Sequence, residues 1–248
     1  MAALYVYGIV PAQGEPLDLP PGVGGGRTVL QRDRATGVAA IVSVLTGPLE
    51  HMRRRDLEAH ELVLRAALDQ RDPVLPLRFG SVYDDGRELE RRLLTPASGE
   101  LARLLDGYAG LVEFELRALY PDEQALLRAI VRERPELARL REEARRKGYA
   151  AQLALGEATL GAYRQRCADD QAFLVDNLAP FVSDWRIREE LQERVAAQIS
   201  FLVERRRRRQ FEQAIEGLAR SDLRLRLTGP LPPYSFLALE QLPALGGD

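Results

Sequence analysis

The hydrophobic period of the sequence changes near residue 120, and this change limits the chain to a mixed fold in two parts. Before residue 120, short runs rich in β-forming residues alternate with segments of helical spacing. These patterns predict strands over residues 4–10, 27–31, 38–45, 74–80 and 112–119, and helices over residues 49–68, 87–94 and 98–106. The order indicates one antiparallel sheet backed by helices, so residues 1–120 are expected to form a modified ferredoxin-like α+β domain.

After residue 120 the period is mainly helical. Helices are expected to break at Pro135 and at Gly148. A strand, a helix and a strand then form a β-α-β unit over residues 195–203, 211–218 and 223–227. Residues 121–239 are thus predicted to form a mostly helical α+β domain, and residues 240–248 a frayed tail. The predicted fold class is α+β in two domains.

A heptad-like apolar seam runs through the helical stretch after Leu153. Gln171 occupies the one position of the seam where an apolar residue is missing, and Pro180 predicts a kink or an end. Such a seam packs inside its own chain or pairs with another protein, and internal packing is the more common outcome. As a candidate partner surface, the seam contributes Leu160, Tyr163, Leu174, Leu178, Phe181 and Trp185.

Charge and composition exclude several classes of protein. The chain has 35 basic and 37 acidic residues, so its net charge of −2 gives no reason to expect nucleic acid as a partner. The first residues carry neither the basic nor the apolar region of a signal peptide. Apolar runs fall short of the roughly 18 residues that a membrane span needs. We therefore expect a soluble, cytoplasmic protein with no membrane segment.

The residues that usually carry metal or cofactor chemistry are few and badly spaced. Residues 22–27 are rich in glycine, but Arg27 stands where a dinucleotide-binding loop needs Gly or Ala. His51 and His60 would lie about 13.5 Å apart along one helix, too far to share a metal ion. Cys167 is the only cysteine, which excludes an internal disulfide. We expect His60 to be a packed, hydrogen-bonded residue at the core edge, and Cys167 a buried, unreactive thiol.

The carboxylates do not suggest a catalytic pair. They occur as sequence neighbours, which point about 100° apart on a helix and so do not converge. All four pairs are therefore predicted to be solvated surface: Asp84-Asp85, Glu142-Glu143, Asp169-Asp170 and Glu189-Glu190. The sequence predicts no catalytic residue, no cofactor and no metal site.

Two arginine features remain open. Residues 205–209 are five consecutive arginines, which form either a solvated connection between a strand and a helix or a patch for an acidic partner. Arg78 stands in an otherwise apolar predicted strand, where a guanidinium needs carboxylate or carbonyl partners. It is either an internal ion-pair anchor or part of a docking surface.

Four segments, in their order and spacing, resemble the gas vesicle protein L/F family. They are residues 5–10, 74–83, 201–203 and 229–236, and the likeness extends from about residue 4 to residue 237. The second and fourth segments are the specific ones. The family-motif residues, structural or docking, are Arg78, Phe79, Gly80, Gly229, Pro230, Pro232, Pro233, Tyr234 and Phe236.

The resemblance implies a non-catalytic accessory protein of gas vesicle formation, with no cofactor. It implies binding to the small, very hydrophobic main shell protein and to other accessory proteins, during nucleation or assembly of the vesicle. The implied location is the gas vesicle, within the cytoplasm. The alternative is a small-molecule-binding regulatory module on a ferredoxin-like scaffold, because a fold alone does not fix function.

Overall fold

The computed structural model describes residues 3–33, 37–45, 53–188 and 194–237, and it divides the chain into two compact units. Unit 1 is Met1–Glu113 together with Gly229–Asp248, and unit 2 is Phe114–Thr228. The division therefore falls at residue 113 instead of the predicted residue 120. The motif segment from Gly229 belongs with unit 1, not with the second domain. The predicted tail, residues 240–248, lies outside the described residues.

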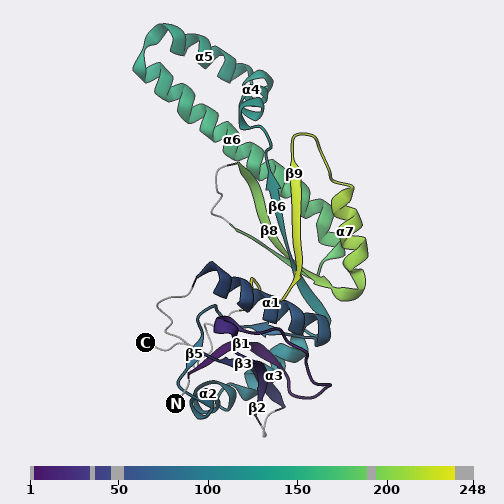
Figure 1. Ribbon diagram of the computed structural model, residues 1–248. Coiled ribbons are helices and arrows are strands. Elements are labelled where there is room, and N and C mark those ends of the chain that lie inside the picture. The colour runs from purple at the N-terminus through teal and green to yellow at the C-terminus, as the bar shows by residue number, and fades with distance from the viewer. Residues whose placement is uncertain (1–2, 34–36, 46–52, 189–193, 238–248) are drawn as a thin grey trace. The chain divides into compact units, whose positions relative to one another are not determined.

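Within the described residues, unit 1 is built on a five-stranded sheet (purple to blue in Figure 1). Its main path is β2-β3-β1-β4, and β5 also pairs with β1. The pairs are antiparallel. The strands are β1 (Leu4–Pro11), β2 (Thr28–Arg32), β3 (Val38–Val44), β4 (Leu75–Pro76) and β5 (Val82–Tyr83).

Helices cover both faces of this sheet, which explains why β1 is an almost uninterrupted apolar run. Tyr5 contacts His60 of α1 (Arg54–Gln70), whereas Val6 belongs to the core cluster on the opposite face. That cluster includes residues of α2 (Gly86–Leu89), the π-helical turn η3 (Glu90–Leu94) and α3 (Ser98–Gly107). Leu49 and Met52, on the predicted start of the first helix, lie outside the described residues.

The predicted strand over residues 74–80 is much shorter in the structure. Only β4 pairs with β1, at Leu75 and Pro76, and Leu77 adds one backbone hydrogen bond to Tyr7. The strand β4 lies at the edge of the sheet, where Pro76, which has no backbone N–H to donate, is tolerated.

Unit 2 contains a four-stranded sheet in the order β7-β8-β6-β9, counted over the described residues. The strands are β6 (Leu111–Leu119), β7 (Asp184–Ile187), β8 (Val195–Glu204) and β9 (Arg224–Leu231). The helices are α4 (Glu123–Glu133), α5 (Pro135–Lys147), α6 (Tyr149–Leu178) and α7 (Arg208–Glu216), with short turns η4 (Ala179–Phe181) and η5 (Arg205–Arg207). The predicted breaks at Pro135, Gly148 and Pro180 are confirmed.

The predicted α+β class with antiparallel pairing is confirmed, but the ferredoxin-like order lies in unit 2. There the elements run β6-α6-β7-β8-α7-β9, with α4 and α5 placed between β6 and α6. Unit 1 has only the short turn η1 (Val23–Gly25) between β1 and β2, among its described residues. The sequence analysis did not predict β7, because Trp185 was assigned to the helical seam and the strand has only four residues, all exposed.

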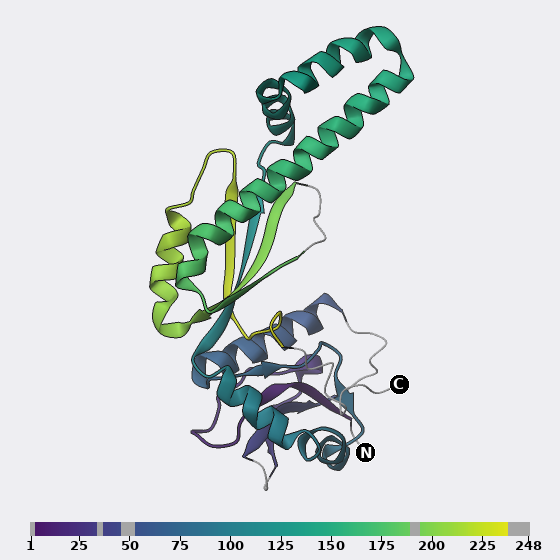
Figure 2. The ribbon, with the colours of Figure 1, turned by 180° about the vertical axis from the view of Figure 1, so that it is seen from behind.

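In unit 2 the long helix α6 and α7 lie on the same face of the sheet (Figure 1), as the reverse view also shows (Figure 2). Rings of three elements hold α7 in place. The Phe211 ring centroid lies 5.5 Å from that of Phe114 on β6 and 5.4 Å from that of Phe201 on β8. The predicted β-α-β unit at the end of the chain is confirmed as β8-α7-β9.

Candidate functional site

Two sequence motifs that are far apart in the chain meet in unit 1 around Tyr5. From the first motif, the Gly80 amide donates to the Tyr5 hydroxyl at 2.9 Å, and the Phe79 ring centroid lies 6.3 Å from that of Tyr5. From the closing motif, Tyr234 lies near both Glu61 and Tyr5. The pKa of Tyr234 is raised mainly by burial, and the nearby Glu61 and Tyr5 add to this shift. The region around Tyr5 is therefore one candidate site.

A buried, uncharged network lies beneath these motifs, and we call Tyr5, Tyr7, Ser43 and His60 the tyrosine–histidine network. The Tyr5 hydroxyl lies 3.0 Å from His60 Nδ1, and the Tyr7 hydroxyl lies 2.8 Å from Ser43 Oγ. The Val23 amide donates to the Tyr7 hydroxyl at 2.7 Å. Every one of these polar groups is paired, as burial requires.

Burial decides the charge state of this network. His60 is 2% exposed, and burial lowers its pKa to about 4, so the imidazole is neutral at pH 7. Burial also raises the pKa of Tyr5 and of Tyr7. The prediction of a packed, hydrogen-bonded His60 is confirmed.

Arg78 does not lie inside a strand, which corrects the prediction. It is exposed and follows β4, and its carbonyl accepts from the Ser81 amide at 3.2 Å and from the Ser81 hydroxyl at 2.8 Å. Gly80, between them, has φ +94°, a left-handed conformation that glycine adopts without strain. The Arg78-Phe79-Gly80 motif therefore forms a tight turn that presents Arg78 and Phe79 on the surface.

The closing motif is anchored on its own unit. Glu113, 3% exposed, accepts from the Ser235 amide at 2.8 Å and from the Ser235 hydroxyl at 2.6 Å. The Tyr108 hydroxyl donates to the Phe236 carbonyl at 2.8 Å.

Gly229 and Pro230 lie in the last part of β9, and Pro232, Pro233 and Phe236 are buried. This geometry favours a structural role for the motif, while docking stays a prediction for Tyr234 and Phe79, which are 39% and 38% exposed.

The candidate partner surface of the sequence divides between core and surface. Leu174 and Leu178 are fully buried, whereas Leu160 is 49% exposed. Tyr163 and Phe181 are half-buried. Trp185 does not continue the helix; it lies on β7, paired with Phe201 of β8, and is 40% exposed. The seam is therefore internal over the last part of α6 and open over its first part.

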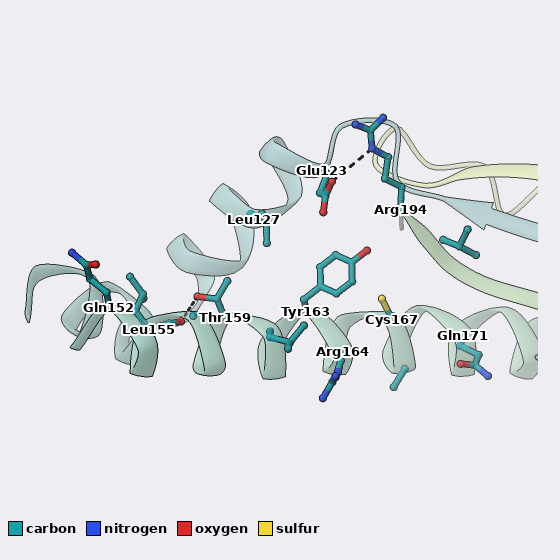
Figure 3. Close-up of a pocket in the computed structure, with 14 residues that line it drawn as sticks. Glu123, Leu127, Gln152, Leu155, Thr159, Tyr163, Arg164, Cys167, Gln171 and Arg194 are labelled. Carbon is teal, nitrogen blue, oxygen red and sulfur yellow. Dashed lines mark hydrogen bonds and ion pairs between the residues drawn. The ribbon is translucent and has the colours of Figure 1, made fainter. Parts of the chain in front are cut away.

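The open part of α6 lines a groove of about 930 Å³ in unit 2. The groove lies between α6, the start of α4 and the start of β8, and the Tyr163 ring points into it (Figure 3). Arg194 and Glu123 form an ion pair at its rim, with Nε and Oε2 3.7 Å apart. Apolar or partly apolar lining comes from Leu127, Leu155, Thr159, Leu160, Tyr163 and Val195.

Cys167 lies at the inner side of this groove as a buried thiol. It is 2% exposed, and burial raises its pKa, so the thiolate is disfavoured. Burial also raises the pKa of Tyr163 to about 12. The prediction that Cys167 is buried is confirmed, and its raised pKa supports the prediction of an unreactive thiol.

An ionic cluster around the buried carboxylate of Asp170 ties α6 to the turn before β9, and we call Tyr120, Arg166, Asp170 and Arg220 the arginine–aspartate network. Asp170 Oδ2 accepts from the Tyr120 hydroxyl at 2.8 Å and from Arg166 Nε at 3.1 Å. Asp170 Oδ1 accepts from Arg220 Nη2 at 2.6 Å. The prediction that Asp169-Asp170 is solvated is thus wrong for Asp170, which is 3% exposed. Asp170 is three residues from Cys167 and four from Leu174. This spacing places Asp170 on the same helix face as two buried residues, and it was the signal in the sequence that indicated burial.

The run of five arginines is largely engaged within unit 2. Arg206 and Arg207 pair with Glu204, and Arg208 pairs with Glu212 at 2.9 Å. The Arg208 guanidinium also lies 5.9 Å from the centre of the Phe114 ring. This geometry favours a solvated connection between β8 and α7.

Neither a metal-binding cluster nor a membrane-spanning helix is found in the described part of the chain. No cluster of three or more His, Cys, Asp or Glu side chains that could hold a metal ion occurs among residues 3–33, 37–45, 53–188 and 194–237. None of the helices formed by these residues is long and apolar enough to cross a membrane.

Comparisons with known proteins cover nearly the whole chain. The family model described as "Gas vesicle synthesis protein GvpL/GvpF" matches residues 3–238. Gas vesicle protein F of Streptomyces sp. (strain CB03234) is 35% identical over 240 residues, covering 94% of this chain and 98% of that protein. Gas vesicle protein F1 of Halobacterium salinarum is 25% identical over 238 residues, with 94% and 92% coverage.

Solved structures share the fold. The crystal structure of the gas vesicle protein GvpF from Anabaena sp. PCC7120 superposes with a TM-score of 0.84 at 24% identity, covering 95% of this chain and 98% of that one. The GvpF structure from Microcystis aeruginosa gives a TM-score of 0.79 at 22% identity, with 95% and 99% coverage.

Proposed function

The chain belongs to the gas vesicle synthesis protein GvpL/GvpF family, which implies a role in gas vesicle formation, and on that premise we propose that it is a non-catalytic accessory protein that binds the main shell protein. In this role it assists nucleation or assembly of the vesicle. Its place of action is the vesicle as it forms in the cytoplasm, and other accessory proteins are its further partners.

The observation that carries the proposal is the open groove along α6. Leu153 and Leu160 are 51% and 49% exposed, and both lie on the seam whose continuation packs in the core of unit 2. A subunit that assembles through apolar surface must keep that surface covered until it is placed in the shell. Exposed leucines beside a groove of about 930 Å³ are suited to cover it temporarily.

Co-purification tests the proposal. We expect the tagged protein, co-expressed with the main shell protein of the same genome, to capture that protein, and we expect Leu160→Glu to lose the capture. Leu62→Glu is the matched control, because Leu62 is 56% exposed on α1 of unit 1. Failure of the wild-type protein to capture the shell protein would contradict the proposed function.

The surface formed by the family motifs is the alternative binding site for the shell protein. Phe79→Glu places a charge at an exposed aromatic ring of the first motif without removing a core side chain. Capture that survives Leu160→Glu and is lost with Phe79→Glu would move the binding site from the groove to the surface around Tyr5.

A further inference from the structure

One stripe of α6 is covered over half its length and open over the other half. The stripe contains Tyr149, Leu153, Gly156, Leu160, Tyr163 and Cys167, at alternating steps of four and three residues. Tyr149 is 80% exposed at its start, whereas Leu174 and Leu178, further along the same stripe, are fully buried. The open half is therefore a direct continuation of a surface that already forms an apolar interface within the chain.

The spacing of the open half matches the spacing by which helices pack against one another. Alternating steps of four and three are the heptad pattern, in which each side chain fits between four side chains of a facing helix. From Tyr149 to Tyr163 the stripe runs for about 21 Å along the axis. An extended strand would find no partner here, because the backbone groups in the middle of α6 are bonded within the helix.

Gly156 lies in the groove, in the middle of this open stripe. A Cβ atom added there would meet nothing within 4 Å, so the packing of the described chain does not require glycine at this position. Glycine destabilises a helix interior relative to alanine. A glycine in a helix surface does, however, let a second helix approach the backbone closely.

The charges at the rim favour a helix with an acidic flank. Glu123 already pairs with Arg194 across the groove. Arg164 also lines the groove and is exposed, and its side chain points away from the Tyr163 ring (Figure 3). A carboxylate on the occupant beside Arg164 would complement this charge.

We infer that the groove receives one amphipathic α-helix of the shell subunit, lying along α6 and approaching it most closely at Gly156, with an acidic side chain beside Arg164. The identity of the partner rests on the proposed function. The helical form of the occupant and the place of closest approach rest on the stripe, the groove and Gly156.

A matched pair of glycines tests the place of closest approach. Gly161 is also within α6, also has nothing within 4 Å of an added Cβ, and does not line the groove. We expect Gly156→Leu to weaken capture of the shell protein roughly tenfold, because a bulky side chain overfills the contact. We expect Gly161→Leu to bind as the wild type does. Circular dichroism of both variants verifies that α6 has formed.

Cross-linking tests the helical form. A photo-cross-linking residue is placed in turn at Leu153, Leu160 and Arg164, and the attached shell-protein residues are identified by mass spectrometry. A helix predicts attachment points three, four or seven residues apart, with an acidic residue near the point reached from position 164. Points two residues apart, or equal binding by Gly156→Leu and Gly161→Leu while the wild type captures the shell protein, would overturn the inference alone. Absence of wild-type capture would overturn the proposed function instead.

Discussion

The two units bury polar groups in different ways. Unit 1 buries the tyrosine–histidine network, in which hydroxyl groups and a neutral imidazole satisfy one another. Unit 2 buries the arginine–aspartate network, in which one carboxylate is shared by two guanidinium groups and a tyrosine hydroxyl. An uncharged network is sensitive to protonation of its histidine, whereas an ionic network is sensitive to the loss of one charged partner.

The same comparison distinguishes the residues that carry the family resemblance from those that we propose to bind the partner. Three of the four segments that carry the resemblance, including both specific ones, lie in unit 1, where much of their length is buried or bonded to neighbouring residues. The fourth, residues 201–203, lies on β8 of unit 2 and is buried. The open apolar stripe lies in unit 2, on a helix without any of those motifs. Residues that make a family recognisable are therefore, in this protein, largely those that hold unit 1 together.

The largest expected effect is loss of the shared carboxylate in unit 2. Asp170→Ala leaves the buried Tyr120 hydroxyl without its carboxylate acceptor. It also removes one of the two carboxylates that Arg166 and Arg220 share, so that they keep only Asp222 in common. We expect the free energy of unfolding to fall by about 3 kcal/mol. Urea unfolding followed by the fluorescence of Trp185, the only tryptophan, measures it. Asp169→Ala is the adjacent control, exposed and expected to change stability by less than about 0.5 kcal/mol. Equal losses of stability in Asp170→Ala and Asp169→Ala would contradict a stabilising role of the arginine–aspartate network.

Acidification should destabilise unit 1 through His60. The folded state holds this imidazole neutral down to about pH 4, while the unfolded chain takes up a proton near pH 6.5. Stability is thus complete above pH 6.5 and is lost as the pH falls toward 4, by roughly 3 kcal/mol. Urea unfolding at several pH values measures the slope, which His60→Gln should reduce. An unchanged slope in His60→Gln would contradict the buried, neutral state.

A smaller effect is expected when one hydroxyl of the tyrosine–histidine network is removed. Tyr5→Phe keeps the ring but leaves His60 Nδ1 and the Gly80 amide without their partner, so we expect a loss of about 1–2 kcal/mol. Thermal unfolding measures this change. Tyr149→Phe, at a residue that is 80% exposed, should leave the stability unaltered. A neutral Tyr5→Phe would show that the network adds little to unit 1.

The smallest effect has the opposite sign and concerns the open helix of unit 2. Gly156→Ala and Gly161→Ala should each raise the stability of the isolated protein by up to about 1 kcal/mol, because alanine favours the helix and has free space at both positions. Differential scanning calorimetry measures the shift. A decrease at position 156 alone would mean that the described chain itself needs glycine there.

Local signals in the sequence predicted the local structure well. The buried strands β1, β3 and β8 were indicated by apolar runs, and the helix ends in unit 2 by Pro135, Gly148 and Pro180. The short strand β7 was missed because its alternation of polar and apolar residues spans only four positions and Trp185 also continued the helical spacing of the seam. Without β7, the ferredoxin-like order of unit 2 could not be deduced.

Contacts between residues far apart in the sequence were harder to predict than individual helices and strands. The seam on α6 was identified, but which part of it the sheet covers depends on tertiary packing that no local pattern contains. Asp170 was taken for surface because its pairing with Arg220 joins residues fifty positions apart. Likewise, the pairing of Ser235 with Glu113 was not visible in the sequence, and the closing motif was assigned to the wrong part.

The division of the chain has a consequence for its synthesis. The sheet of unit 1 is synthesised before unit 2, but Ser235 and Phe236, which bond to Glu113 and Tyr108, emerge only after all of unit 2. A nascent chain that ends before residue 229 carries a complete unit 2 and an unfinished unit 1. Loss of the segment from residue 229 to residue 236 therefore acts on the unit whose strands were synthesised first.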